Sequence, residues 1–408
     1  MSLNNRIFLG AVSGVLLGFL LSWLGSAHVF SQSALYIGHL VAGLFIGLLK
    51  MVLVPLVFTS IVVGVANLRL HQQMHKVWQI TLLCFLCSTS IAIALGLTAA
   101  HVFQPGQGMT LASFQGVMQG HTVTELSLSE FVQKFVLGLF VNPFAALAQG
   151  NILAIVMFAL FLGVALAGNA ERYPRFSQFM EEGFHLTMQL VQWIMQLAPL
   201  GILALLMKLV ATENSDLLVS LATFIAVVTG TTLFHGIVIL PTIAWLFGRV
   251  SPWRFWQGSR PALLTAFATS SSSATIPVTM TCLERDFKVS PQITGFVVPM
   301  GAQLNMDGTA LYEAAAALFV ANLVGMDLNL GQQLIVCFTA MLASIGAPSI
   351  PSAGMVTMVM VLQSVGLPAE AIAILLPIDR ILDTVRTAVN VEGDIVASLV
   401  VSQQTREG

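Results

Sequence analysis

Residues 371–401 read AIAILLPIDRILDTVRTAVNVEGDIVASLVV and form the most informative stretch of this 408-residue chain. Five polar side chains in it are spaced four, three, four and four positions apart: Asp379, Asp383, Arg386, Asn390 and Asp394. A helix with 3.6 residues per turn brings residues at these intervals onto one face. A charged side chain at the centre of a bilayer costs about 2.5–3.5 kcal/mol. The stripe therefore predicts a polar pocket in which the charges are balanced by one another, by ions or by a substrate.

The composition places this stripe in a membrane protein. Hydrophobic residues make up 57% of the chain, charged residues only 8%, and the mean hydropathy is +0.89. Soluble domains carry about 25% charged residues, so we expect a polytopic, all-α integral membrane protein with almost no soluble domain. The chain has no basic cluster, which argues against nucleic acid as a partner. The N-terminus lacks a small-residue cleavage site, so it predicts the start of a first span and not a removed signal peptide.

Eight apolar segments are long enough to cross a bilayer. They are residues 6–25, 36–68, 77–103, 130–168, 184–212, 217–248, 291–325 and 368–402. The second and fourth are too long for one perpendicular crossing, so a tilt or a break is expected. Pro55 and the pair Asn142-Pro143 are the predicted break points.

Two further segments, 253–282 and 331–365, consist of short apolar arms around a centre rich in Ser, Gly and Pro. Neither arm can cross a bilayer alone, so each segment predicts a re-entrant helical hairpin. Two interrupted segments in corresponding halves of a chain are typical of a transporter's binding site. Lys and Arg fall in alternate connecting segments only if both hairpins return to the side they came from. This pattern predicts eight spans, two hairpins and both termini on the cytoplasmic side of the plasma membrane.

Some polar residues leave alternatives open. Residues 305–309 (NMDGT) are expected to unwind the span 291–325 and to expose carbonyl oxygens suited to small cations. Asp307 could instead pair with Arg386, and Asp383 with Arg386 could be a purely structural ion pair. Glu313 could carry a proton or be a buried neutral acid. Arg380 lies about 100° away from the stripe on the helix, so we expect it to anchor the helix or to pair elsewhere.

Four motifs resemble the glutamate transporter family, the dicarboxylate/amino acid:cation symporters that include archaeal aspartate transporters and animal excitatory amino acid transporters. They are TSSSSATIPVTM (269–280), NMDGTALYEA (305–314), SIGAPSIPSAG (344–354) and DRILDTVRTAVNVEGD (379–394). The resemblance implies inverted repeats, a homotrimer and an elevator mechanism. Residues 1–76 and 130–212 would form the trimer scaffold, and 77–103 and 217–402 the mobile transport domain, with hairpin 1 at 253–282 and hairpin 2 at 331–365.

The resemblance also implies roles for individual residues. Arg386 would pair with the side-chain carboxylate of the substrate and Asp383 with its α-amino group. The remaining substrate contacts would come from Thr309, Thr387, Asn390, from the backbone near Ser271 and Ser272, and from Pro351 and Gly354. Cotransported sodium ions would bind at three sets of ligands: Gly301, Asn305, Asn390 and Asp394; Met306, Ser344 and Ile345; and Ser88, Thr89, Asn305 and Asp307. Glu313 would take part in proton coupling.

The charges favour an acidic amino acid as substrate. A neutral amino acid would leave Arg386 desolvated and unpaired, and a dicarboxylate without an amine would leave Asp383 unpaired. The sequence therefore predicts a sodium-coupled symporter of aspartate or glutamate, with protons as a second coupled ion. The alternatives are a proton-coupled dicarboxylate symporter, a neutral amino acid symporter and a passive anion channel. An enzyme is not expected, because the serines at 270–273 have no His in their own or the next span to activate them.

Relatives in the glutamate transporter family usually carry an additional Arg where this chain has Ser270 or Thr384.

Overall fold

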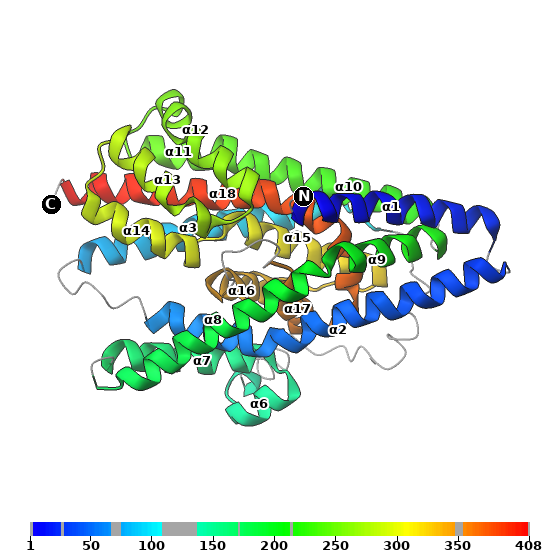
Figure 1. Ribbon diagram of the computed structural model, residues 1–408. Coiled ribbons are helices and arrows are strands. Elements are labelled where there is room, and N and C mark those ends of the chain that lie inside the picture. Colours follow the sequence, from blue (N-terminus) through cyan, green and yellow to red (C-terminus); the bar gives the residue numbers. More distant parts are fainter. Residues whose placement is uncertain are drawn as a thin grey trace.

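The computed structural model describes residues 3–25, 28–66, 75–107, 137–169, 172–212, 215–346 and 354–406, and every regular element in these ranges is a helix (Figure 1). The N-terminal half contains α1 (Leu3–Leu24), α2 (Val29–Ala66), α3 (His75–Phe103), α6 (Pro143–Gln149), α7 (Ile152–Asn169), α8 (Pro174–Gln196) and α9 (Ala198–Thr212). The C-terminal half contains α10 (Ser215–Phe234), the π-helical turn η3 (His235–Ile239), α11 (Leu240–Leu246), α12 (Pro252–Thr269), α13 (Ser272–Arg285), α14 (Pro291–Leu304), α15 (Asp307–Val324), α16 (Leu330–Gly346), α17 (Gly354–Ser364), the 3₁₀ turn η4 (Ala369–Ala371) and α18 (Ile372–Arg406).

Within the described ranges, four stretches of continuous helix are long and apolar enough to cross a membrane: Arg6–Leu24, Val29–Ala66, Lys76–Phe103 and Val219–Leu246. The helices α8 and α9 would make a fifth span together, with a bend of 50° between them. The other predicted spans contain breaks or several charged residues. In the spans 291–325 and 368–402, such interruptions are what the sequence predicts for the part of a transporter that binds its cargo.

The two predicted break points behave differently. Helix α2 is continuous for 38 residues and has Pro55 inside it, so the predicted break there is wrong. At 1.5 Å per residue, such a helix is about 57 Å long, and a tilt is then the way to fit it to a hydrocarbon core of about 30 Å. The break at Asn142-Pro143 is confirmed. The Asn142 side chain accepts hydrogen bonds from the first turn of α6, and Gly150 ends this short helix with a φ of 68°. Residues 130–136 of the same predicted span lie outside the described ranges.

Both predicted hairpins are pairs of packed helices. In hairpin 1, α12 packs against α13, and the turn between them is made by Ser270 with a φ of 51° and by Ser271, whose side chain accepts from the backbone N–H of Ala274 at 3.2 Å. A serine at this N-cap position satisfies one of the free N–H groups of α13. In hairpin 2, α16 packs against α17, while the tip at 347–353, including Pro351, lies outside the described ranges.

The span 291–325 is broken where the sequence predicts it. Helix α14 ends at Leu304 and α15 begins at Asp307, with Asn305 and Met306 in non-helical backbone between them. A second irregularity, the π-helical turn η3, directly precedes Pro241 in α11. Proline has no N–H to donate to the preceding turn, which explains why the regular α-helical hydrogen bonding is lost there.

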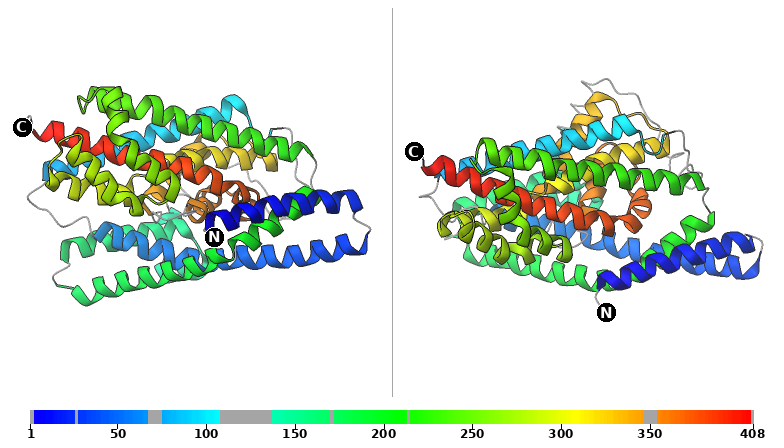
Figure 2. Two further views of the ribbon diagram at one scale, coloured as in Figure 1. Left: turned by 45° about the horizontal axis from the view of Figure 1, so that its top comes forward. Right: turned by 90° about the horizontal axis from the view of Figure 1, so that it is seen from above.

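Helix α18 is central to the C-terminal half. It packs against α3, α10, α11, α12, α13, α14, α15 and α17, and both views in Figure 2 show it flanked by α10–α11 and by α12–α14. In the other half, α2 packs on α7, α8 and α9, and α1 packs on α9. Helix α3 belongs to the N-terminal half by sequence but packs on α10, α15, α16 and α18 of the C-terminal half. Hairpin 2 and α18 add contacts to the other N-terminal helices, since α16 and α17 contact α2 and α7, and α18 contacts α9.

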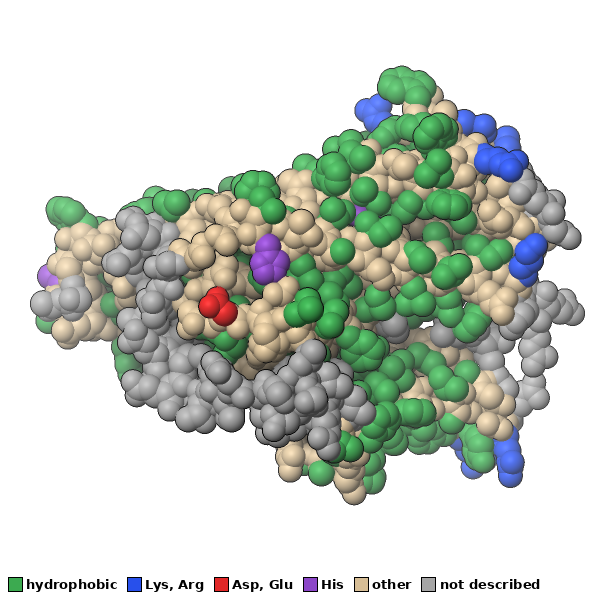
Figure 3. Space-filling view, turned by 180° about the vertical axis from the view of Figure 1, so that it is seen from behind, with side chains coloured by type: hydrophobic (Ala, Val, Ile, Leu, Met, Phe, Trp, Pro, Cys, Tyr) green, Lys and Arg blue, Asp and Glu red, His purple; other side chains and the backbone are tan. Residues whose placement is uncertain are grey.

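The molecular surface suits a lipid environment. On the face shown in Figure 3, hydrophobic side chains cover much of the surface, while Lys and Arg side chains gather at one end. Basic residues at one end of a membrane protein are typical of its cytoplasmic side. This distribution agrees with the alternation of basic segments read from the sequence.

Candidate substrate and cation site

Four charged side chains of α18 form a first buried group, which we call the substrate cluster: Asp379, Arg380, Asp383 and Arg386. The Arg386 Nη2 atom donates to Asp379 Oδ1 at 2.7 Å and to Asp383 Oδ1 at 2.9 Å. Arg380 Nη1 donates to Asp383 Oδ2 at 3.2 Å. The formal charges of the cluster sum to zero, so attraction between the opposite charges offsets part of the desolvation cost of burying them. The expectation that Arg380 pairs elsewhere is wrong, because Arg380 lies one turn before Asp383 and reaches the carboxylate that Arg386 also binds.

The Arg386 guanidinium is only partly used by these ion pairs. Its side chain is 1% exposed, and its Nε and Nη1 atoms have no hydrogen-bond partner within the described part of the chain. An unpaired buried donor costs about 1–3 kcal/mol, more when it is charged. The N–H groups of these two nitrogens, on different sides of the guanidinium, are therefore available to bind an anion.

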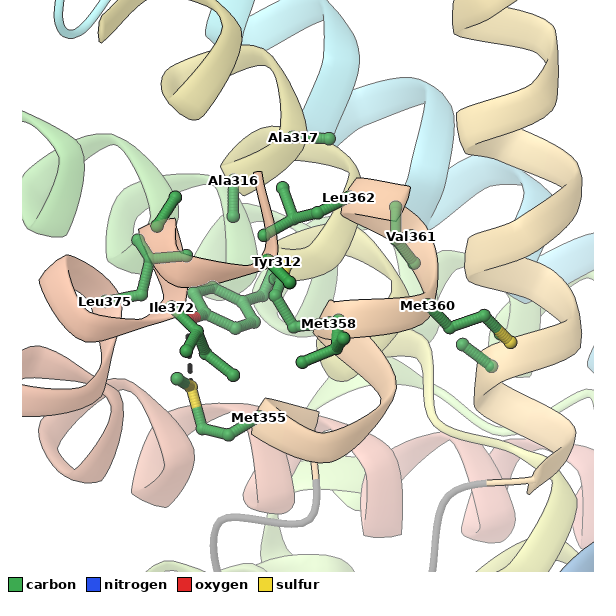
Figure 4. Packing of buried hydrophobic residues seen from close by; sticks show 14 of the residues in the cluster. Tyr312, Ala316, Ala317, Met355, Met358, Met360, Val361, Leu362, Ile372 and Leu375 are labelled. Carbon is green, nitrogen blue, oxygen red and sulfur yellow. Dashed lines mark hydrogen bonds between the residues drawn. The ribbon is translucent and has the colours of Figure 1, made fainter. Parts of the chain in front are cut away.

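Tyr312 of α15 supports the guanidinium from one side. The Arg386 Cζ atom lies 4.1 Å from the centroid of the Tyr312 ring, close enough for a cation–π interaction. The Tyr312 hydroxyl lies 3.5 Å from the sulfur of Met355 in α17, and Figure 4 shows the ring packed beside Ile372 and Leu375 at the start of α18. One aromatic ring thus connects α15, hairpin 2 and the substrate-cluster helix.

Two glycines allow backbones to approach the cluster closely. A Cβ atom on Gly308 would lie 2.7 Å from the carbonyl oxygen of Arg386, so α15 could not start this close to α18 with a larger residue. A Cβ atom on Gly354 would lie 3.0 Å from Thr309 and 3.6 Å from Arg386 Nη2, which places the start of α17 against the guanidinium. The predicted grouping of Gly354, Thr309 and Arg386 is therefore present in the structure.

Asn390 joins the broken span to α18. Its Oδ1 atom accepts from the backbone N–H of Gly308 at 2.8 Å, and its Nδ2 atom donates to Thr309 Oγ1 at 3.2 Å. Both groups come from the first turn of α15, so Asn390 caps the N–H groups that the break leaves free. Thr387, one turn before it, is also buried.

A second buried group, which we call the cation cluster, contains Asp307, Asn305, Asp394 and His235. Asp307 Oδ1 accepts from Ser88 Oγ at 3.2 Å and from Thr89 Oγ1 at 2.7 Å, both from α3. Asp307 Oδ2 lies 3.2 Å from His235 Nε2. The alternative pairing of Asp307 with Arg386 is not what the structure has, and the predicted set of Ser88, Thr89 and Asp307 is assembled.

Asp394 lies at the other end of this cluster. Asn305 Nδ2 donates to Asp394 Oδ1 at 3.1 Å, while Asn305 Oδ1 has no hydrogen-bond partner within the described residues. A Cβ atom on Gly301 would lie only 2.3 Å from Asp394 Oδ1, so the carboxylate lies directly on the last turn of α14. Carboxylate, amide and carbonyl oxygens are hard ligands suited to small cations. In the described ranges, no three His, Cys, Asp or Glu side chains are placed so that they could hold a metal ion together, so a cation here would rely on these mixed oxygens.

Glu313 is buried on α15 and touches hairpin 2. Its Oε1 atom accepts from the hydroxyl of Thr357 in α17, while its Oε2 atom has no hydrogen-bond partner in the described ranges. The alternatives of a proton carrier and a buried neutral acid both fit this geometry.

The remaining predicted residues have less direct placements. Ser271 caps α13, Ser272 begins that helix, and α13 packs on α18. Ser344 is buried near the end of α16, where its hydroxyl donates to the Met341 carbonyl, and Met306 is buried at the break before α15. Ile345 is helical, and its side chain lies outside the described part of the structure.

Comparisons with known proteins agree with this geometry. A sequence profile of the sodium:dicarboxylate symporter family matches residues 3–404. The chain belongs to this family. Human excitatory amino acid transporter 3 is 32% identical to this chain, and the similarity covers 99% of the chain and 86% of the human protein. The proton/sodium-glutamate symport protein of Bacillus caldotenax is 33% identical over 98% of the chain and 93% of the bacterial protein. A putative sodium-dependent excitatory amino acid transporter of Caenorhabditis elegans is 32% identical over 97% of the chain.

Proposed function

We propose that the protein is a secondary active symporter that takes up aspartate or glutamate together with sodium. The observation that carries this proposal is the buried Arg386, whose Nε and Nη1 atoms have no hydrogen-bond partner among the described residues, while Asp383 lies 2.9 Å from its Nη2 atom. A guanidinium next to a carboxylate matches a substrate that carries a carboxylate next to an ammonium group. The names of the relatives, which are glutamate and excitatory amino acid carriers, support the same substrate class.

In the proposed bound state, the substrate's side-chain carboxylate accepts from Nη1 of Arg386. The ammonium group of the substrate donates to Asp383. The α-carboxylate is bound by the backbone at the tips of the two hairpins, near Ser271 and Ser272 and near Gly354. Thr309, Thr387 and Asn390 complete the polar contacts. A neutral amino acid would leave the buried guanidinium without its anion.

Sodium coupling is supported by the cation cluster. Asp394 has no cationic partner within the described ranges, and the only basic side chain beside Asp307 is a histidine. Burying a carboxylate without a counter-charge is costly. Sodium bound by these carboxylates, by Asn305 and by nearby carbonyl oxygens would remove this cost. It would also offset the net negative charge of the substrate, so ions and substrate would favour each other's binding.

The movement that we propose is an elevator. In support of this, α7, α8 and α9 pack on α2, while α3 and α10 to α15 pack on α18. We propose that residues 1–76 and 130–212 form the scaffold and that residues 77–103 and 217–402 form the transport domain. The second group would slide across the membrane with its cargo, hairpin 2 acting as gate, within a homotrimer. Native mass spectrometry tests the assembly: a dominant mass of three chains supports it, and a dominant monomer at every detergent concentration contradicts it.

Uptake into proteoliposomes tests the substrate and the ions. We expect labelled aspartate or glutamate to accumulate with an inward sodium gradient, and serine and succinate not to accumulate. Arg386→Cys should abolish acidic amino acid uptake, whereas Arg254→Cys, at an exposed arginine near the start of α12, should leave it unchanged. Unchanged aspartate uptake in Arg386→Cys would contradict the proposed role. Uptake that never exceeds the outside concentration would indicate a passive channel.

Proton coupling is a second part of the proposal, supported by the buried Glu313 and its contact with Thr357 of hairpin 2. An acid that touches the gate can link its protonation to gate closure. With a pH-sensitive dye inside the vesicles, sodium-driven uptake should acidify the lumen in the wild type and should not do so in Glu313→Gln. Wild-type uptake without acidification would exclude this part and leave sodium symport intact.

A further inference from the structure

A cavity of about 410 Å³ lies between α10–η3, α12 and α18, and none of the residues of the substrate and cation clusters lines it. Its walls are apolar, with Leu233, Ile237, Leu264 and Phe267 among them. Between 42% and 58% of each of these four side chains is exposed. Such exposure of large apolar side chains in a membrane protein means that the cavity opens toward the bilayer.

The cavity has one buried polar group on its wall. Glu392 of α18 lines it, is 2% exposed, and its Oε1 atom has no hydrogen-bond partner within the described residues. The carboxyl group lies against η3, since a Cβ atom on Gly236 would be 2.9 Å from Glu392 Oε2. A buried polar atom without a partner carries a desolvation cost that a ligand can remove.

Arg260 of α12 also lines the cavity and is exposed. It makes no hydrogen bond or ion pair with the described residues, so its charge remains available at the cavity. A cationic ligand would be repelled by Arg260, and an anionic ligand would be repelled by a charged Glu392. A hydroxyl group avoids both costs, because it carries no charge and can both donate and accept a hydrogen bond. It can therefore pair with the Glu392 carboxyl in either protonation state.

We propose that this cavity is a binding site for a neutral, apolar alcohol that enters from the bilayer, with its hydroxyl group on Glu392 and its hydrocarbon body along α10 and α12. The volume suits such a ligand, since an apolar cavity of roughly 150 Å³ binds benzene and ligand pockets run from about 300 to 1,000 Å³. The site is separate from the proposed transport function and does not depend on it.

Photolabelling tests this site. The purified protein in nanodiscs is irradiated with a diazirine-bearing octanol, and labelled positions are found by mass spectrometry. We expect labels on α10, α12 and α18 beside the cavity. Excess decanol should remove them, whereas decane, decanoate and decylamine at the same concentration should not. Glu392→Leu should lower the labelling about fivefold, the effect of losing one hydrogen bond. Glu392→Gln, which keeps an acceptor oxygen, should label like the wild type.

A matched pair of variants tests the position of the ligand. Leu264, which is 58% exposed, lines the cavity, so Leu264→Trp should fill part of its volume. Leu246 of α11 is equally exposed (57%) but does not line the cavity, so Leu246→Trp is the matched control. Only the first should lose labelling. Competition by decane equal to that by decanol would overturn the proposal, as would stronger competition by decylamine or decanoate. The competition series uses the wild-type protein, so it stands even if a variant fails to fold.

Discussion

The two charged clusters are neighbours, but they differ in whether their buried negative charges have positively charged partners within the protein. The substrate cluster contains two carboxylates and two guanidiniums, all within one turn or two of α18, and is balanced without help. The cation cluster contains the carboxylates of Asp307 and Asp394, and in the described ranges neither Lys nor Arg pairs with them. The comparison teaches that opposite charges within one helix can offset the cost of their own burial, whereas the two carboxylates of the cation cluster need positive charge from elsewhere.

The largest effect is expected in the cation cluster. Asp394→Asn should reduce sodium-driven uptake by about two orders of magnitude, as expected for removing one partner of a buried charge pair. Raising the sodium concentration should recover part of the activity, because the lost affinity is for the ion. Asp327→Asn, at an exposed aspartate between α15 and α16, is the control. If Asp394→Asn and the wild type showed the same dependence of uptake on sodium concentration, the proposed role of Asp394 in binding sodium would be contradicted.

The next effect is expected at Asp383. Replacing this carboxylate by Asn removes the proposed partner of the substrate's ammonium group, so the KM for aspartate should rise about 10- to 100-fold. Inhibition of residual uptake by succinate, which has no amino group, should not weaken. Equal losses for both compounds would mean that Asp383 serves only to hold Arg386.

The junction between the clusters can be tested through sterics. Gly308→Ala would push a methyl group against the backbone of Arg386, and such overpacking typically costs about 1–3 kcal/mol of stability. We expect a lower midpoint of thermal unfolding. Gly295→Ala in α14, where a Cβ atom meets open space, should leave the midpoint unchanged or raise it, because alanine favours helix. A similar midpoint for both variants would show that the close approach is not needed.

The smallest effect is expected at Arg380. In the proposed bound state this arginine competes with the substrate's ammonium group for Asp383, and it lies farther from that carboxylate (3.2 Å) than Arg386 does (2.9 Å). Arg380→Ala should lower the KM for aspartate about threefold, while Arg380→Lys should stay near the wild type. A raised KM in the alanine variant would assign Arg380 a supporting role and not a competing one.

The sequence predicted the features that depend on local spacing. The stripe on α18, the break at Asn305-Met306 and the two hairpins each follow from helix periodicity or from helix-breaking residues within a short window. Long-range contacts were not predictable in this way. Tyr312 was quoted only as part of a motif, because nothing local shows that its ring lies on the Arg386 guanidinium. Thr357 was missed because its partner, Glu313, lies 44 positions away.

His235 shows why periodicity can fail. It begins the π-helical turn η3, in which each turn contains an extra residue, so the faces before and after it are out of step. A helix drawn with 3.6 residues per turn through this region gives no reason to place His235 beside Asp307, 72 positions away. The local signal was Pro241, which interrupts the hydrogen bonding near η3. Pro55 carried the same signal in α2, where the helix continues, so proline alone does not decide the outcome.

The break in the span 291–325 has an electrostatic consequence. Each half-helix has its own dipole, so α14 ends in partial negative charge at Leu304 and α15 begins with partial positive charge at Asp307. The positive end is compensated by the carboxylate of Asp307 in the first turn and by Asn390 accepting from Gly308. The negative end instead faces a further negative group, since Asp394 lies on Gly301 in the last turn of α14. A single interruption of two residues thus creates, far from water, a spot whose potential attracts positive ions.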